Sequence, residues 1–267
     1  MHQGSDFERK TTRLSGGSMD YFVAGTGPDV VCVHGASGFA IRAVPLRLRQ
    51  RFRVWLPILP GYEGTPRIEG VDSVSDLAGL LAEFIDAQIG RRCELVGHGM
   101  GARIAAWLAI LHPAKVAQLV MMAPGGLRPA GAPALDASPE AVLRQLYAHP
   151  ERQPPETRSA AERESDTAAA RRYGSGPARD EALLARLPEI AAVTLILGGS
   201  KDPRAPAEAV QAVKSALPRA NLIYVYDAAH MLEVDQPERV ASLVEDFFVR
   251  GDAFVVNPGK VRVADPA

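Results

Sequence analysis

Residues 95–103 read LVGHGMGAR, and this stretch decides the fold. Two apolar residues lead into three glycines, Gly97, Gly99 and Gly101, which alternate with two larger residues. The helix-like run ARIAAWLAILHP follows at once. A short apolar strand that passes through glycines into a helix is typical of a sharp strand-to-helix turn in an α/β protein. The question raised by the stretch is what the central position, Gly99, does without a side chain.

The rest of the chain repeats the alternation of strand and helix. Short apolar runs typical of buried strands lie at 19–25, 29–35, 52–61, 93–97, 116–124, 193–199 and 221–229. Helical periodicity covers 73–90, 102–113, 206–218 and 237–249, and Ser73 with Asp76 predicts a capping box for the first of these helices. Near-continuous apolar strands separated by helices predict a mostly parallel, doubly wound sheet covered on both faces. Ligands of such sheets bind at the carboxyl ends of the strands.

Residues 125–188 break this rhythm and are rich in Ala, Pro, Arg and Glu. Within them, 138–149 is helical in pattern, and the rest is weakly patterned. We therefore expect a core formed by 1–124 and 189–267, with 125–188 inserted as a helical cap. A solvated pair of charged helices that contacts no ligand is the alternative.

Composition narrows the class of protein. The chain has 267 residues, 47% of them hydrophobic, and a formal net charge of −1, without a basic stripe for nucleic acid or an apolar run for a membrane. Cys32 and Cys93 lie in apolar runs, which indicates free thiols in a reducing compartment. With no signal-peptide pattern at the start, we expect a cytoplasmic protein. The six histidines show no metal-ligand spacing, and no metal or cofactor is expected.

Four motifs follow strand ends in a fixed order. They are His34-Gly35, the Gly97-x-Gly99-x-Gly101 turn, Asp202 in a G-x-x-D-x-x-x-P run, and His230 shortly before Gln-Pro-Glu. With these motifs, which span about 20–257, the chain resembles the α/β-hydrolase superfamily. In that family the glycine turn is a nucleophile elbow, followed along the chain by the acid and then the histidine.

The resemblance implies a role for each matching residue. His230 is expected to be the general base and acid, and Asp202 to fix its tautomer. The backbone N–H groups of Ala36 and Met100 are expected to form an oxyanion hole. Weaker candidates for substrate contacts are Ser37, Tyr147 and Tyr173. The implied substrate is a small molecule, either a small ester or a compound with a C–C bond beside a carbonyl; no oligomeric state is predicted.

Gly99 departs from the family pattern, which places a serine there. Without Oγ the acyl-enzyme route is closed, so an enzyme of this kind would use His230 and Asp202 in non-covalent acid–base chemistry. Two other readings stay open: a non-catalytic descendant that binds a ligand or partner, and a hydrolase whose serine was deliberately replaced. The turn also fits the dinucleotide pattern G-x-G-x-x-A, but residues 117–125 contain no acidic residue to hold a ribose.

Overall fold

The computed structural model describes residues 6–174 and 179–255, and they form one eight-stranded sheet in the order β1-β2-β4-β3-β5-β6-β7-β8. The six strands from β4 to β8 run parallel, while β2 pairs antiparallel with β4 and β1 antiparallel with β2. The strands are β1 (Glu8–Leu14), β2 (Gly17–Ala24), β3 (Asp29–Val33), β4 (Arg53–Pro57), β5 (Cys93–His98), β6 (Val116–Met122), β7 (Val193–Gly199) and β8 (Ala220–Val225). The predicted α/β architecture with a mostly parallel sheet is confirmed.

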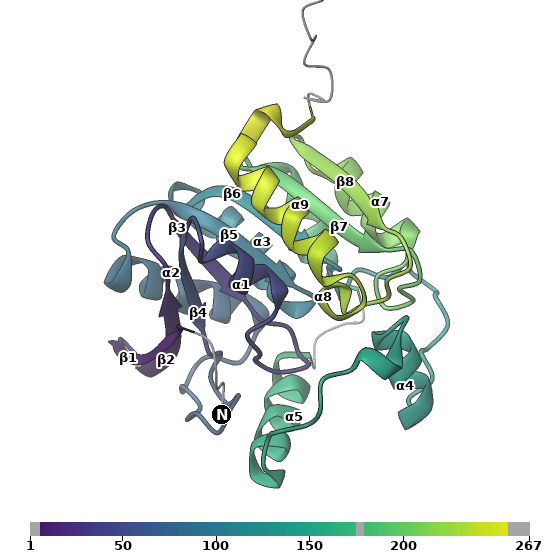
Figure 1. Ribbon diagram of the computed structural model, residues 1–267, viewed down its shortest axis with the longest axis horizontal. Helices are drawn as coiled ribbons and strands as arrows, with labels where there is room; N and C mark the ends of the chain where they lie inside the picture. The colour runs from purple at the N-terminus through teal and green to yellow at the C-terminus, as the bar shows by residue number, and fades with distance from the viewer. Residues whose placement is uncertain (1–5, 175–178, 256–267) are drawn as a thin grey trace, which may run out of the picture.

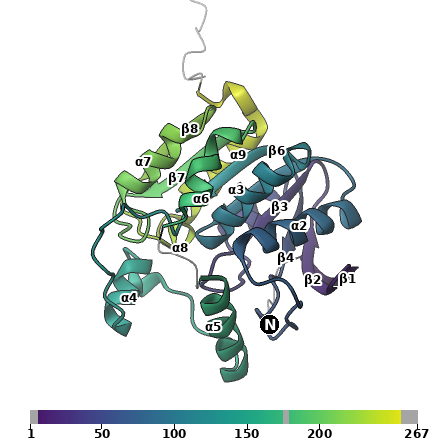
Figure 2. The same ribbon diagram turned by 180° about the vertical axis from the view of Figure 1, so that it is seen from behind.

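Helices cover both faces of the sheet. One face carries α1 (Ala43–Leu48), α8 (Leu232–Asp235) and α9 (Pro237–Arg250) (Figure 1). The other face carries α2 (Val74–Gln88), α3 (Met100–Leu111), α6 (Glu181–Arg186) and α7 (Ala207–Ala216) (Figure 2). The short 3-10 helices are η1 (Pro113–Lys115), η2 (Pro150–Arg152), η3 (Leu187–Glu189) and η4 (Gly251–Val255).

The hydrophobic core lies on both sides of the central strands. Val30, Val31, Leu95 and Leu195 are fully buried in neighbouring strands, as the continuous apolar runs predicted. At the start of α2 the expected capping box is present: the Ser73 hydroxyl accepts from the Asp76 amide, and the Asp76 carboxylate accepts from the Ser73 amide. Local sequence signals and tertiary packing therefore agree over the sheet and its flanking helices.

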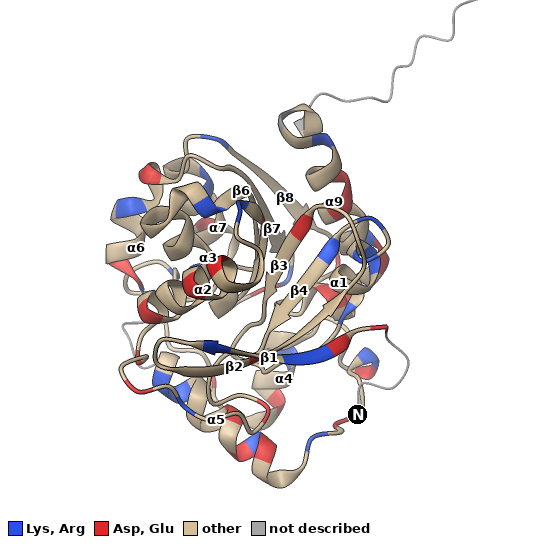
Figure 3. Cartoon of the chain, turned by 90° about the vertical axis from the view of Figure 1, so that its left-hand side faces the viewer, with Lys and Arg blue, Asp and Glu red and all other residues tan. Residues whose placement is uncertain are grey.

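The strand β1 is an element that the apolar pattern did not predict. Its sequence, ERKTTRL, is polar and mostly exposed, because it forms the outer edge of the sheet. It is held by antiparallel pairing with β2 and by Arg9 and Thr11, which both bond to Asp20. Charged side chains on an edge strand also discourage pairing with another chain. Figure 3 shows residues of both charge signs on this part of the molecule.

The inserted segment has two parts, one that stands apart from the sheet and one that packs against the core. Helices α4 (Pro139–Leu146) and α5 (Ala160–Gly174) stand apart from the layers of the sheet in both views (Figures 1 and 2). By contrast, α6 packs on the core, where Leu183 is fully buried. Asp180 caps the Leu183 amide and forms an ion pair of 2.9 Å with Arg103 of α3. The protruding part of the predicted cap thus ends before α6, while the extent 125–188 stays a prediction.

Breaking this buried ion pair should be costly. We expect Asp180→Ala to lower the free energy of unfolding by about 3–5 kcal/mol, because it leaves the guanidinium of Arg103 buried and unpaired and removes a helix cap. The matched control is Glu140→Ala, which removes an exposed i,i+4 pair with Arg144 and should cost less than about 1 kcal/mol. Urea unfolding of the two variants measures the difference, and equal losses would contradict the assignment of α6 to the core.

Within the described ranges, no helix is both long and apolar enough to cross a bilayer. The same ranges hold no group of three or more His, Cys, Asp or Glu side chains that could bind a metal ion. Cys32 and Cys93 are free thiols. Burial raises the pKa of the Cys93 thiol to about 12, so it behaves as a small core residue.

Candidate active site

Gly99 stands at the turn between β5 and α3 with φ 56° and ψ −111°, a conformation that L side chains rarely adopt. The neighbouring glycines are required by close packing. A Cβ on Gly97 would lie 2.2 Å from the Gly101 carbonyl oxygen, and one on Gly101 would lie 2.3 Å from the Val33 oxygen. The sequence therefore folds here into a tight elbow that raises position 99 at the carboxyl end of the sheet.

Asp202 and His230 form a hydrogen-bonded pair. Asp202 follows β7, His230 follows β8, and His230 Nδ1 lies 2.9 Å from Asp202 Oδ2. The other oxygen, Oδ1, accepts from the backbone amides of Arg204 and Ala205. Burial raises the pKa of Asp202, but the bonds from His230 and the two amides outweigh burial and leave it below its ordinary value. The carboxylate is thus an anion that keeps the proton of His230 on Nδ1, so Nε2 is a base.

The basic nitrogen faces the elbow. An ideal Cβ on Gly99 would lie 3.1 Å from His230 Nε2 and 3.7 Å from Cε1. Beyond the turn's own neighbouring residues, these two ring atoms are all that the described chain places within 4 Å of that point. The fold therefore brings together Gly99, His230 and Asp202, and both Gly99 and His230 are buried.

The predicted oxyanion donors lie at the same junction. A Cβ on Gly35 would be 2.9 Å from the His98 oxygen, so the turn after β3 packs directly against the elbow. Ala36 follows in that turn, and Met100 is the first residue of α3. Within residues 6–174 and 179–255, neither backbone N–H donates to a protein acceptor. Two free donors beside the elbow support the predicted oxyanion hole, which stays a prediction.

Two further histidines pack at the elbow, and neither is protonated near neutral pH. His98 Nε2 lies 2.8 Å from the His230 carbonyl oxygen, and the two rings are 5.1 Å apart. His34 Nε2 accepts from the Leu59 amide, so its proton is on Nδ1, facing the Gly35 oxygen. Burial lowers the pKa of His34 to about 4 and of His98 to about 3. Both rings are therefore neutral and act as structural supports.

These depressed values predict a pH effect on stability. Below about pH 6.5 an unfolded histidine binds a proton, while folded His98 stays neutral until the pH approaches 3. The contribution of His98 to the free energy of unfolding is therefore complete above about pH 6.5. It falls by up to about 1.4 kcal/mol per pH unit as the pH is lowered toward 3. Glu94, whose pKa burial raises to about 7, acts in the opposite direction. We therefore expect His98→Gln to flatten the acid loss relative to wild type, as measured by urea unfolding across this range. Parallel pH profiles would contradict it.

Asp235 is a supporting residue that the sequence reading missed. It is fully buried at the end of α8, and its carboxylate accepts from the amides of Ala229, Ala148 and His149. One side chain therefore holds both the residue before His230 and the segment that follows α4. The available signal was an acidic residue shortly after His230. It was not sufficient, because an Asp in a helix-like run is equally typical of an exposed position.

The three predicted substrate contacts have different surroundings. Tyr147 is buried against Met231 and Val234 and lines a groove with Ser37, whose backbone oxygen accepts from Arg158. Tyr173 instead donates its hydroxyl to the Pro60 oxygen and is almost fully buried. Since that hydroxyl is already bonded in the core, Tyr173 fastens α5 to the sheet domain, and a ligand contact is no longer assigned to it.

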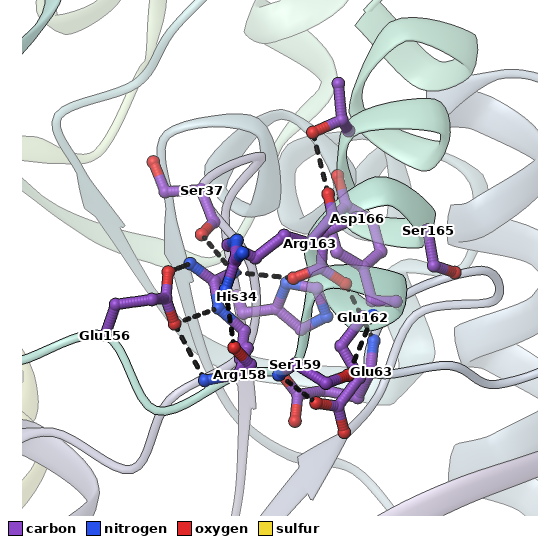
Figure 4. A network of polar contacts seen from close by, with 12 residues as sticks. His34, Ser37, Glu63, Glu156, Arg158, Ser159, Glu162, Arg163, Ser165 and Asp166 are labelled. Atoms are coloured by element: carbon purple, nitrogen blue, oxygen red, sulfur yellow. Dashed lines mark hydrogen bonds and ion pairs between the residues drawn. The ribbon is translucent and has the colours of Figure 1, made fainter.

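Arg158 joins the cap to the turn after β3. Figure 4 shows its guanidinium between Glu156 and Asp166, with Ser37 close by. Asp166 also accepts from the Glu63 amide, and a Cβ on Gly38 would lie 2.7 Å from Asp166 Oδ2. The cap thus contacts residues 37–38 through Arg158 and Asp166.

This packing changes where the cavities lie. The motifs and the inserted segment predict a mostly apolar pocket between the elbow and residues 125–188, with His230 and Asp202 among its polar features. The structure has a cavity of ≈ 50 Å³ beside His34, His98 and Met231, and a groove of ≈ 250 Å³ between residues 37–42 and 153–158. Neither has Gly99 or His230 in its lining, and both of these residues are buried.

With fold and site in place, the chain can be assigned to a class: it belongs to the alpha/beta hydrolase family, whose model matches residues 30–243. Haloalkane dehalogenase 2 of Mycobacterium tuberculosis is 27% identical over 91% of this chain and 95% of its own. Pimeloyl-(acyl-carrier protein) methyl ester esterase of Aeromonas hydrophila is 33% identical over 37% of this chain, and the match spans only 39% of that relative.

Solved structures agree on the fold. A serine hydrolase from Cycloclasticus zankles superposes with a TM-score of 0.77 at 16% identity, covering 94% of this chain and all of the other. A meta-cleavage product hydrolase from Pseudomonas fluorescens IP01 gives 0.76 at 20% identity, covering 90% of this chain and 97% of its own. At these identities the likeness concerns the fold alone.

Proposed function

We propose that the protein is a non-covalent catalyst in which His230, held by Asp202, acts as base and acid on a small carbonyl compound. The observation that carries the proposal is the direction of His230 Nε2, which faces the space that a side chain of residue 99 would occupy, where the family pattern has a nucleophile. Glycine leaves that space to water or substrate. An intact base beside two free backbone donors is the machinery for proton transfer at a carbonyl.

For an ester, the sequence of steps follows from the geometry. His230 Nε2 takes a proton from a water molecule as that water adds to the carbonyl carbon. The N–H groups of Ala36 and Met100 stabilise the resulting oxyanion. The protonated His230 then donates to the leaving alkoxide, and Asp202 stabilises the imidazolium meanwhile. A C–C bond beside a carbonyl would need the same base and the same donors.

The comparisons support a small-molecule substrate. Two of the similar proteins are named for haloalkanes and for meta-cleavage products, while a third is named for a methyl ester on an acyl-carrier protein. The missing nucleophile favours a second candidate function, a ligand-binding descendant that has lost catalysis. The two functions share the elbow and differ only in whether His230 transfers a proton.

The experiment is a turnover assay with p-nitrophenyl acetate and with a β-diketone, on wild type and on His230→Ala. A general base contributes about 10²- to 10⁴-fold to a rate, so His230→Ala should lower wild-type turnover by that factor. His112→Ala, at the C-terminus of α3, is the matched control and should keep the wild-type rate. If wild type turns over neither substrate faster than His230→Ala does, the catalytic proposal is refuted and the ligand-binding one remains.

A further inference from the structure

Arg42 is a half-buried cation without a partner. It stands at the N-cap of α1 and lines the ≈ 50 Å³ cavity, the ≈ 250 Å³ groove and a further surface cavity of ≈ 470 Å³. Its guanidinium forms no hydrogen bond or ion pair with any residue that the structure describes. A partly desolvated guanidinium is costly unless an anion satisfies it, so an arginine in this state points to a ligand with a negative charge.

Two unpaired hydroxyl groups line the same groove as Arg42. Tyr147 and Ser37 both face it, and neither side-chain hydroxyl bonds to a described residue. Burial raises the pKa of Tyr147, and the nearby charge of Arg42 acts against this, which places the phenol within electrostatic reach of the guanidinium. Three unpaired donors on one groove form a set that a carboxylate can satisfy.

The acidic residues around the groove are engaged elsewhere. Glu156 and Asp166 pair with Arg158, and Glu162 accepts from the Ser159 amide. Glu63 also lines the groove; burial and the charges of Asp166 and Glu162 raise the pKa of its carboxyl, and Arg158 acts against them. The groove therefore has an acidic end around Arg158 and a basic end at Arg42.

Glu233 is the remaining acid near Arg42. Its Oε1 accepts from the Val44 amide at 2.8 Å, and no ion pair joins it to Arg42. Burial raises the pKa of Glu233, with the Val44 amide and Arg42 pulling the other way. Glu233 thus shares the ≈ 50 Å³ and ≈ 470 Å³ cavities with Arg42 and is not part of the lining of the ≈ 250 Å³ groove.

We propose that the groove beside residues 37–42 binds the carboxylate of an acidic substrate, with Arg42 as counter-ion and Tyr147 as second donor. Ser37 directly follows Ala36, so a carboxylate held here directs the rest of the molecule toward the predicted oxyanion hole. The inference rests on the proposed function and specifies its substrate class: small carbonyl compounds that also carry a carboxylate.

Equilibrium binding tests this without turnover. Titration calorimetry with benzoate and with benzamide, which differ chiefly in charge, should show benzoate binding to wild type at least about tenfold more tightly. Arg42→Gln should abolish that preference, and Tyr147→Phe should weaken benzoate binding several-fold. Glu233→Gln keeps an acceptor for the Val44 amide and removes the competing charge, so it should tighten benzoate binding. Arg51→Gln, an exposed arginine close to α1, is the control and should bind as wild type does.

The outcomes separate this proposal from the catalytic one. Equal affinity of wild type for benzoate and benzamide would overturn it, as would a benzoate preference that survives in Arg42→Gln. Unfolding midpoints of each variant confirm that a loss of binding is not a loss of fold. His230→Ala should retain the benzoate preference, since the groove does not use His230. A preference that persists while turnover is absent would refute catalysis alone, and the reverse result would refute the carboxylate site alone.

Discussion

Replacing Gly99 with serine is expected to create a covalent hydrolase. The serine Oγ would project from the elbow toward His230 Nε2, with Asp202 already bonded to the ring and two free N–H groups beside it. Because the dyad and donors are assembled, we expect hydrolysis of p-nitrophenyl acetate to rise by at least about 10²-fold over wild type. A burst of p-nitrophenol should precede steady turnover, since an acyl-enzyme would now form.

The gain should carry a cost in stability. A side chain at φ 56° and ψ −111° is strained by about 1–3 kcal/mol, and the His230 ring must yield a few tenths of an ångström because it lies 3.1 Å from the Cβ position. Gly99→Ala is the matched control, with the same strain and contact but no hydroxyl. It should lose the same stability and gain no burst. A folded Gly99→Ser protein with the esterase rate of Gly99→Ala would contradict the assembled site.

Gly101→Ala is expected to damage the fold severely. Its Cβ would lie 2.3 Å from the Val33 oxygen and 2.6 Å from the His34 oxygen, both backbone atoms at the end of β3. Neither can move without shifting the strand or the helix α3. We expect a loss of about 3 kcal/mol or more in the free energy of unfolding, measured by urea denaturation.

Gly79→Ala is the control for that substitution. Gly79 is also a helical glycine, in α2, and a Cβ there would meet nothing within 4 Å. Alanine should therefore raise the stability, by up to about 1 kcal/mol, through its higher helix propensity. If the free energy of unfolding changes no more in Gly101→Ala than in Gly79→Ala, the elbow can accommodate a Cβ, and the close packing assigned to Gly101 is wrong.

Local patterns in the sequence predicted most of the fold. The apolar runs predicted the central strands, because strands buried on both faces need side chains that are apolar throughout. They also predicted β8, although most of its residues are only partly buried at the edge of the sheet. The glycines of 97–101 predicted the elbow, since nothing larger fits against the turn after β3. The polar β1 could not be read in this way, because an edge strand is stabilised by backbone pairing with β2 rather than by burial.

The site was predictable in its motifs and not in its surroundings. Gly99, Asp202 and His230 each occupy a turn with its own sequence signature, and the sheet brings them together. Arg42 and Asp235 have no such signature, because their roles depend on neighbours that are distant in the sequence. Among the described residues Arg42 has no hydrogen-bond or ion-pair partner, whereas Asp235 accepts from three backbone amides. The position of the cap over residues 37–42 depends on Arg158 and Asp166, a contact between segments far apart in sequence.

The central claim is that the elbow is fully assembled and lacks only a nucleophile at position 99. Its most direct test is to measure the mass of the whole protein after exposure to a fluorophosphonate. Wild type should keep its mass, and Gly99→Ser should gain one phosphonyl group as its Oγ displaces fluoride. The double variant Gly99→Ser with His230→Ala should gain none, because His230 supplies the base. A folded Gly99→Ser protein that stays unmodified, or a wild-type protein that acquires a His230-dependent adduct, would contradict the account.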